Sequence, residues 1–293
     1  MTYTRIVSIA RLGVVAAISM ALSAACSSQK PALIGLVEAH DAAAALQVHF
    51  TKAVEASNRA VMADTDEASI TAAHEAEQAT HAALADVARL RPLLGDLQLA
   101  DELRALEAFD TRFTEYRRID RDILQLAVEN TNLKAQKLLF GACTDAVAEI
   151  RAAVAALAQS QRGISADRKD ALVAQTAAAV LEVQVVLARH IAEADEAAMT
   201  RMEERIHILE SSANTGISSL GPGTRPEALA AARSALDRFK TIVEEITQLS
   251  RRNTNVRSLA LALGRQRTIT SQCHENLRQL ATALSAHTFN ATR

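Results

Sequence analysis

Two copies of an Asn-Thr-Asn segment carry the polar side chains whose types and spacing could bind a ligand. The copies lie in residues 125–141, QLAVENTNLKAQKLLFG, and 248–264, QLSRRNTNVRSLALALG. Amide groups, a helix N-terminus and a cation suit a carboxylate or a phosphate. Ordinary turn and capping chemistry explains the same residues, because Asn tolerates a left-handed backbone and Asn and Thr cap helix starts. The candidate residues are Asn130, Asn132, Lys134, Asn253, Asn255 and Arg257.

Histidine and glutamate spacings suggest a second chemistry, metal binding. His74, Glu77 and His81 fall at i, i+3 and i+7 on one helix face, and Glu204 with His207 forms the Glu-x-x-His half of a di-iron pair. A di-iron site needs two such motifs, whereas this sequence has one, and a solvated helix face explains these residues equally well. There is no C-x-x-C-H haem motif. We therefore expect no cofactor.

Cys143 and Cys273 are the two cysteines beyond the N-terminal region. An exported protein invites a disulfide between them. However, Cys143 lies 11 residues past Asn132 and Cys273 lies 18 past Asn255. In equivalent parallel helices this difference displaces them by about 10 Å, beyond disulfide reach. We expect buried free thiols, with a disulfide as the alternative if the units pack side by side.

Residues 1–25 have the pattern of an export signal. A basic start precedes an apolar core at 12–22, and small residues then lead to a cleavage point. Cys26 follows directly in LSAAC, which resembles a lipobox, so we expect lipid attachment at Cys26 and a tether over 26–34. Ordinary signal-peptidase cleavage and an uncleaved anchor are the alternatives. All three place the mature chain outside the cytoplasm, in the periplasm.

Composition favours long helices packed through small side chains. Trp is absent, only 3% of residues are aromatic, and Gly and Pro are scarce at 9 and 4 of 293. Without residues 1–25 the chain has 30 basic against 34 acidic residues. Since nucleic-acid binding needs a cationic face, this balance argues against it.

Hydrophobic periodicity predicts four helices in the first half. Polar breaks at 64–66, Pro92 with Gly95, and the first Asn-Thr-Asn separate them. The fourth has a coiled-coil-like seam with alternating steps of three and four. The predicted ranges are 32–61, about 66–90, about 100–129 and 133–157.

The second half repeats the first with an offset of 126, then of 123 from Gln125 onward. We expect its first two helices to turn between 190 and 195, although one continuous helix is the alternative. The loop at 219–227 precedes a last hairpin of 228–249 and 256–284. The predicted fold is all-α, an elongated antiparallel up-and-down bundle with tandem four-helix units at 35–163 and 164–290.

The runs FKTIVEEITQLSRRNTNVRSLALALG (239–264) and ENTNLKAQKLLFGA (129–142) resemble the third helix, turn and fourth helix of the sensor domain of methyl-accepting chemotaxis receptors. The resemblance covers most of residues 35–290, as two tandem copies. It implies an extracytoplasmic four-helix bundle that binds small ligands or partner proteins and often dimerises.

Chemotaxis receptors continue into a second membrane span and a cytoplasmic signalling coiled coil, whereas this sequence reaches Arg293 with neither. We therefore expect a free-standing, lipid-anchored periplasmic bundle that binds a small-molecule ligand or a membrane receptor, with a homodimer as one assembly. No Gly-rich phosphate loop, G-x-S-x-G or H-E-x-x-H motif indicates an enzyme. The alternatives are a structural or protein-interaction envelope lipoprotein without a ligand, and a metal-binding bundle.

Overall fold

The computed structural model describes residues 4–291, with side chains for 33–287, and its regular elements are all helical. The predicted all-α class is therefore confirmed. The predicted export signal, the predicted lipid-attachment residue Cys26 and most of the predicted tether at 26–34 fall outside the residues whose side chains are described.

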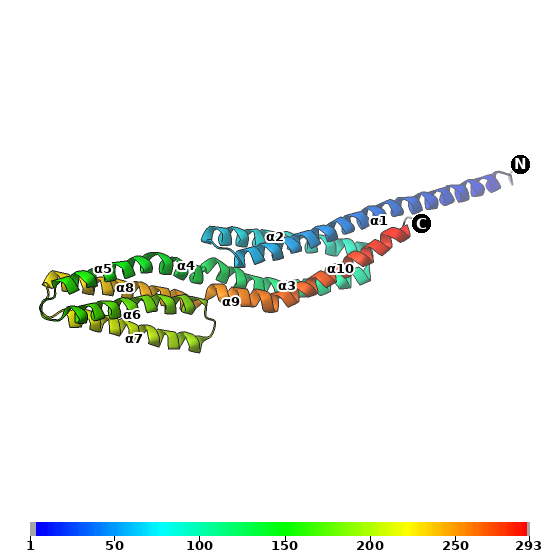
Figure 1. Cartoon of the computed structure of the whole chain (residues 1–293). Coiled ribbons are helices and arrows are strands. Elements are labelled where there is room, and N and C mark those ends of the chain that lie inside the picture. The colour runs from blue at the N-terminus through cyan, green and yellow to red at the C-terminus, as the bar shows by residue number, and fades with distance from the viewer. Residues whose placement is uncertain (1–3, 292–293) are drawn as a thin grey trace. The chain divides into compact units, whose positions relative to one another are not determined.

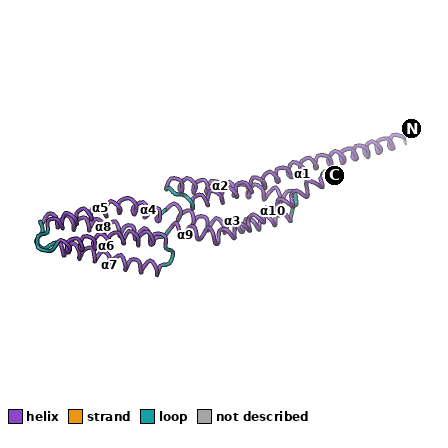
Figure 2. Tube along the Cα trace, in the orientation of Figure 1, coloured by secondary structure: helices purple, strands orange, loops and turns teal. Residues whose placement is uncertain are grey.

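Figures 1 and 2 show the order of the helices and the short loops that join them. The elements are α1 (Thr4–Val61), α2 (Asp66–Asp96), α3 (Ala100–Glu129), α4 (Thr131–Leu138), the π-helix η1 (Leu139–Cys143), α5 (Thr144–Ser160), α6 (Ala166–Ala192), α7 (Glu196–Leu220), α8 (Pro226–Arg252), α9 (Thr254–Leu261), the π-helix η2 (Ala262–Gln266) and α10 (Arg267–Ala291).

The turn expected between 190 and 195 is present, because α6 ends at Ala192 and α7 begins at Glu196. Asp195 caps α7 by accepting hydrogen bonds from the amides of Ala197 and Ala198. The predicted end of the second helix near residue 90 is wrong, since α2 continues through Pro92 to Asp96. The extra turn buries Leu94 completely, and this burial outweighs the one backbone hydrogen bond that proline removes.

The helices form two compact units that differ from the contiguous halves expected at 35–163 and 164–290. Unit 1 takes in Met1–Arg59, Thr71–Arg121 and Ala262–Arg293, and unit 2 takes in Ala60–Ile70 and Asp122–Leu261. Both units are therefore discontinuous in sequence. Unit 1 draws its last helix from the second sequence repeat.

Asn130 and Asn253 interrupt their helices as single residues in the left-handed conformation, with φ of 50° and 51°. We predicted a helix-to-helix turn at each. The chain passes from unit 1 to unit 2 within α3, between Arg121 and Asp122, and returns to unit 1 between Leu261 and Ala262. Each Asn-Thr-Asn therefore lies in unit 2, about two helical turns from the point where the chain changes unit.

The two π-helices occupy equivalent positions, since η1 and η2 are separated by the repeat offset of 123. In each, one apolar residue points to solvent, with Phe140 73% and Leu263 63% exposed. The last residue of each, Cys143 or Gln266, is buried. A single π turn adds one residue to a helical turn and so rotates all following side chains. This rotation places the side chain of Gln266 beside Ser57 and Asp120 in unit 1.

The core of unit 1 is built around Phe50. Its ring meets those of Phe109, Phe113 and Tyr116 edge-on, with centroid distances of 5.6, 5.7 and 5.2 Å. The ring of His274 also contacts the ring of Phe50, with a centroid distance of 5.0 Å. Such perpendicular contacts place the positive ring edge against the negative face of its neighbour.

Asp120 has a buried carboxyl group, since the residue is only 3% exposed. The hydroxyl of Ser57 donates to it at 2.5 Å and the amide of Gln266 donates at 2.7 Å. Burial nevertheless dominates and raises the pKa of Asp120 from 3.8 to about 6. The buried hydroxyl of Tyr116 also acts on this carboxyl group and lowers its pKa.

Replacing Asp120 by Asn should stabilise the protein at neutral pH. Because the folded-state pKa is raised, the stability from this group is present below about pH 4 and lost as the pH rises through about 6. The loss is on the order of 3 kcal/mol. Asn keeps the accepting oxygen without the charge, so urea unfolding at neutral pH should shift to higher concentration. The exposed neighbour Asp122→Asn is the control, and equal shifts for both variants would contradict this account.

Candidate functional site

The two Asn-Thr-Asn segments, residues 130–132 and 253–255, meet inside unit 2 and cap each other; we call this pair the asparagine joint. The backbone amide of Thr131 donates to the hydroxyl oxygen of Thr254 at 3.0 Å, and the amide of Thr254 donates to that of Thr131 at 3.2 Å. The two hydroxyls are 3.1 Å apart. The first amides of α4 and α9 are thus satisfied by the opposite copy rather than by their own.

The asparagine side chains extend the same exchange. The amides of Asn132 and Asn255 each donate to the other's side-chain oxygen at 3.2 Å. The Asn132 side chain donates to Asn253 at 2.8 Å, and that of Asn255 donates to Asn130 at 2.8 Å. The pattern has near twofold symmetry, broken at the buried Nδ2 of Asn130, which has no partner among the described residues.

The joint also holds the loop between α6 and α7. Asn132 donates to the carbonyl of Ile191 at 2.6 Å and Asn253 donates to that of Glu193 at 2.8 Å. These carbonyls belong to the end of α6, where helices leave carbonyls without partners. A rearrangement of this loop therefore breaks hydrogen bonds at the joint.

Of the six residues predicted as an anion site, the structure brings the four asparagines together. Their amides bond mainly to one another and to the loop, so they cap and tie helices. Lys134 donates instead to the carbonyl of Glu129 at 2.8 Å. Arg257 lies on α9 outside these contacts.

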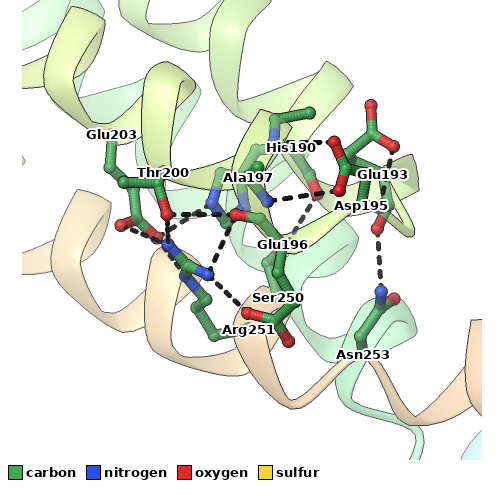
Figure 3. Close-up of polar contacts among 11 residues, drawn as sticks. His190, Glu193, Asp195, Glu196, Ala197, Thr200, Glu203, Ser250, Arg251 and Asn253 are labelled. Atoms are coloured by element: carbon green, nitrogen blue, oxygen red, sulfur yellow. Dashed lines mark hydrogen bonds and ion pairs between the residues drawn. The ribbon is translucent and has the colours of Figure 1, made fainter.

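Next to the joint lies a buried histidine that the sequence analysis did not single out, His190 at the end of α6. Its Nδ1 lies 2.7 Å from the hydroxyl of Ser250, and its Nε2 lies 3.1 Å from Glu203 on α7 (Figure 3). Arg251 binds both oxygens of Glu203, at 2.6 and 2.8 Å. This hydrogen bond from Arg251 lowers the pKa of Glu203, and burial lowers the pKa of His190.

These shifts define the protonation of the network. With Glu203 ionised, neutral His190 carries its proton on Nε2, and the one hydroxyl proton of Ser250 is shared between Nδ1 of His190 and the backbone carbonyl of His190, which lies 2.9 Å from the hydroxyl oxygen. The order Ser250, His190, Glu203 resembles a hydrolase triad. However, Ser250 and His190 are both 0% exposed, so a substrate cannot reach the hydroxyl in this conformation. The network connects α6, α7 and α8.

A cavity in unit 2 shares Glu203 and Arg251 with this network. It is a groove of about 710 Å³ between α7 and α8, with a floor of Ile206 and Val243. Its polar wall consists of Glu203, His207, Glu210, Lys240, Glu244, Thr247, Gln248 and Arg251. This volume suits a small molecule, and an apolar floor with a few polar groups is typical of ligand sites.

Glu210 is the most enclosed carboxylate of the groove that is not bound by arginine. Its side chain is 13% exposed, and Nδ1 of His207 lies 3.5 Å from it, an ion pair only when that histidine is protonated. Burial raises the pKa of Glu210, and the negative charge of Glu244 adds to the rise. Lys240 opposes it. The site therefore contains a carboxylate whose charge is incompletely compensated.

The sequence carried a signal for this groove. On α8, Lys240, Glu244, Gln248 and Arg251 recur at steps of four, four and three. On α7, polar residues recur at 203, 207 and 210. Such stripes are usual on solvated faces, and only the packing of α7 beside α8 makes them face each other.

The cysteines are free. Cys143 and Cys273 are buried and unbonded in the structure, Cys143 in unit 2 and Cys273 in unit 1, and the disulfide between them stays an untested alternative. Burial raises the pKa of Cys143 to about 11 and that of Cys273 to about 12. Both thiols therefore stay protonated and unreactive at neutral pH.

The metal candidates lie on exposed helix faces. His74, Glu77 and His81 line the outside of α2, where His74 contacts Gln78 at 2.8 Å, and Glu204 and His207 are exposed on α7. Among the described residues, no three His, Cys, Asp or Glu side chains gather as a metal ion would require. His207 instead lines the groove.

One described helix, α6, is long and apolar enough to cross a membrane, with a mean hydropathy of 1.8 over its best 18-residue window. Its side chains Leu172, Val180, Val183 and Leu187 are buried in the core of unit 2. A core helix meets the same criteria of length and composition, so these criteria alone do not indicate a span.

No protein-family model matches the chain, and no curated protein is significantly similar to it.

Replacing Asn132 by Ala should lower the free energy of unfolding by about 2–4 kcal/mol. The change leaves the amide of Asn255, the side-chain oxygen of Asn253 and the carbonyl of Ile191 without this partner in a buried site. Urea denaturation measures the loss. Asn214, exposed on α7, provides the matched control Asn214→Ala, with an expected change below about 0.5 kcal/mol. Similar small changes for both variants would show that the joint contributes little.

Proposed function

We propose that this chain is a non-enzymatic, sensor-like helix bundle of the cell envelope that binds a small solute in the groove between α7 and α8. The resemblance of its Asn-Thr-Asn segments to chemotaxis-receptor sensor domains supports the class. The export pattern of residues 1–25 and Cys26 supports a periplasmic location with a lipid anchor.

The observation that carries the proposal is the groove itself. Helices in a bundle normally close on one another through apolar seams. Here α7 and α8 leave about 710 Å³ open above Ile206 and Val243, with charged side chains along both walls. A groove of this kind buries the body of a small solute and fixes its orientation through a few polar groups.

The contacts around the groove explain how occupancy could alter the protein. Glu203 lines the groove and also bonds to His190 and Arg251. Arg251 in turn reaches Glu196 and Thr200 at the start of α7 (Figure 3). The asparagine joint binds the loop before α7 through the carbonyls of Ile191 and Glu193. A solute that changes the spacing of α7 and α8 therefore acts on hydrogen bonds at the joint.

Thermal unfolding of the full chain should identify the solute class. We expect one class among amino acids, organic acids, aromatic acids, amines and divalent metals to raise the melting temperature saturably. At 100 times the dissociation constant, the added stability is about 2.7 kcal/mol.

A matched pair of variants locates the effect. Thr247→Trp fills the groove and should abolish the shift, whereas Thr241→Trp on the exposed face of α8 should retain it. Both threonines donate to the backbone carbonyl four residues earlier, so the local change is the same. No shift with any solute would refute the proposal and favour a structural or partner-binding bundle. A shift retained by Thr247→Trp would show that the solute binds outside the groove.

A further inference from the structure

We infer that the groove between α7 and α8 binds a small organic cation, with its ammonium group between Glu210 and Glu244 and its apolar body over Ile206 and Val243. This inference rests on the proposed solute site and names the chemical class that the site selects.

The first argument is the charge that the groove leaves uncompensated. Arg251 is already fully bonded, because its five N–H groups are matched by five acceptor contacts on Glu203, Glu196 and Thr200. It offers nothing to an anionic solute. Glu203 is likewise occupied, since both its oxygens accept from Arg251 and one also meets His190.

The free charges are therefore those of Glu210, Glu244 and Lys240, with a sum of one negative charge when His207 is neutral. Glu210 and Glu244 act on each other electrostatically, and Lys240 acts on Glu210. Lys240 forms no ion pair within 4.0 Å among the described residues. Gln248 donates to Glu244 at 3.1 Å, a neutral contact that leaves its charge in place. An ammonium group between the two carboxylates compensates both.

The second argument is the enclosure of Glu210. A carboxylate with 13% of its side chain exposed has lost most of its hydration, and its contact with His207 at 3.5 Å is long. Buried charges are normally paired. A bound ammonium donates short, charge-assisted hydrogen bonds at this position. An anion would instead face the carboxylates with Lys240 as its one available cation among the lining residues.

The third argument is the shape of the apolar part. Ile206 and Val243 are each 3% exposed and form the floor between the two ends of the groove. From Glu210 to Glu203 the helix rises by about 10 Å, the length of a solute with roughly six carbons. The ammonium end would lie at Glu210, while the far end meets the closed ion pair of Glu203 and Arg251.

Calorimetric titration of the full chain with three probes of equal length tests this inference. Hexylamine, hexanol and hexanoate share one apolar body and differ in charge at neutral pH. Hexylamine should bind at least about tenfold more tightly than hexanol, and hexanoate should not bind, because pairing with a half-buried carboxylate contributes well over RT. Tighter binding of hexanoate would overturn the inference while leaving the groove as a solute site. No binding of any probe, together with no shift in the solute screen, would refute both.

Two variants with opposite expected signs make the test specific. Glu210→Gln should weaken hexylamine binding about tenfold or more, whereas Lys240→Gln should strengthen it, since the competing cation is removed. Glu204→Gln, which changes an exposed glutamate outside the groove on the same helix, should leave affinity unchanged. If Glu210→Gln binds as well as the parent, or if Lys240→Gln weakens binding, the inference is wrong. Circular dichroism of each variant verifies that it is folded. If Glu210→Gln is not folded, the affinity of Lys240→Gln for hexylamine decides the test alone.

Discussion

The reciprocal capping of two helix starts is the interaction on which unit 2 depends. An α-helix leaves its first backbone amides without acceptors, and α4 and α9 both begin inside the protein, where water cannot supply them. Each buried amide left unpaired would cost about 1–3 kcal/mol. Thr131 and Asn132 supply acceptors for α9, and Thr254 and Asn255 supply them for α4. The near-identity of the two segments follows, because each must fit the other.

The asparagine joint is connected to the groove through the loop between α6 and α7. Asn132 and Asn253 bind the end of α6, His190 at that end meets Glu203, and Glu203 borders the groove. The contacts at the joint and the contact between His190 and Glu203 are hydrogen bonds between buried or half-buried groups, whose loss is costly. This continuity links the α7–α8 groove to the asparagine joint.

The helices themselves could be predicted from sequence, because periodicity and capping residues act locally. The break at Asn130, the turn before Glu196 and the loop before Pro226 all follow from nearby residues. The direction of the chain after Asn130 does not follow from nearby residues. A left-handed asparagine serves both a reversing turn and a kink, and distant packing chooses between them. Hence the contiguous units expected at 35–163 and 164–290 differ from the discontinuous units of the structure.

The candidate site was harder to predict for a related reason. The bonds of the joint link residues 123 positions apart, so the spacing within either copy does not reveal them. His190 is one histidine in an Ala-rich helix, without a local motif. The stripe from Lys240 to Arg251 is indistinguishable from a solvated face until α7 lies beside it. What sequence did supply was the exact repeat, which marked the joint as special without giving its partner.

A double-mutant cycle on Thr131 and Thr254 tests the reciprocal capping most directly. Valine keeps the shape of threonine and removes the hydroxyl, so Thr131→Val, Thr254→Val and the double variant are compared by urea denaturation. We predict that both single variants lose similar stability and that the double variant loses about 1 kcal/mol less than their sum, because the two hydroxyls share one hydrogen bond. A loss from only one of the two variants, or from neither, would contradict reciprocal capping, whereas additive losses from both would contradict only the hydrogen bond between the two hydroxyls.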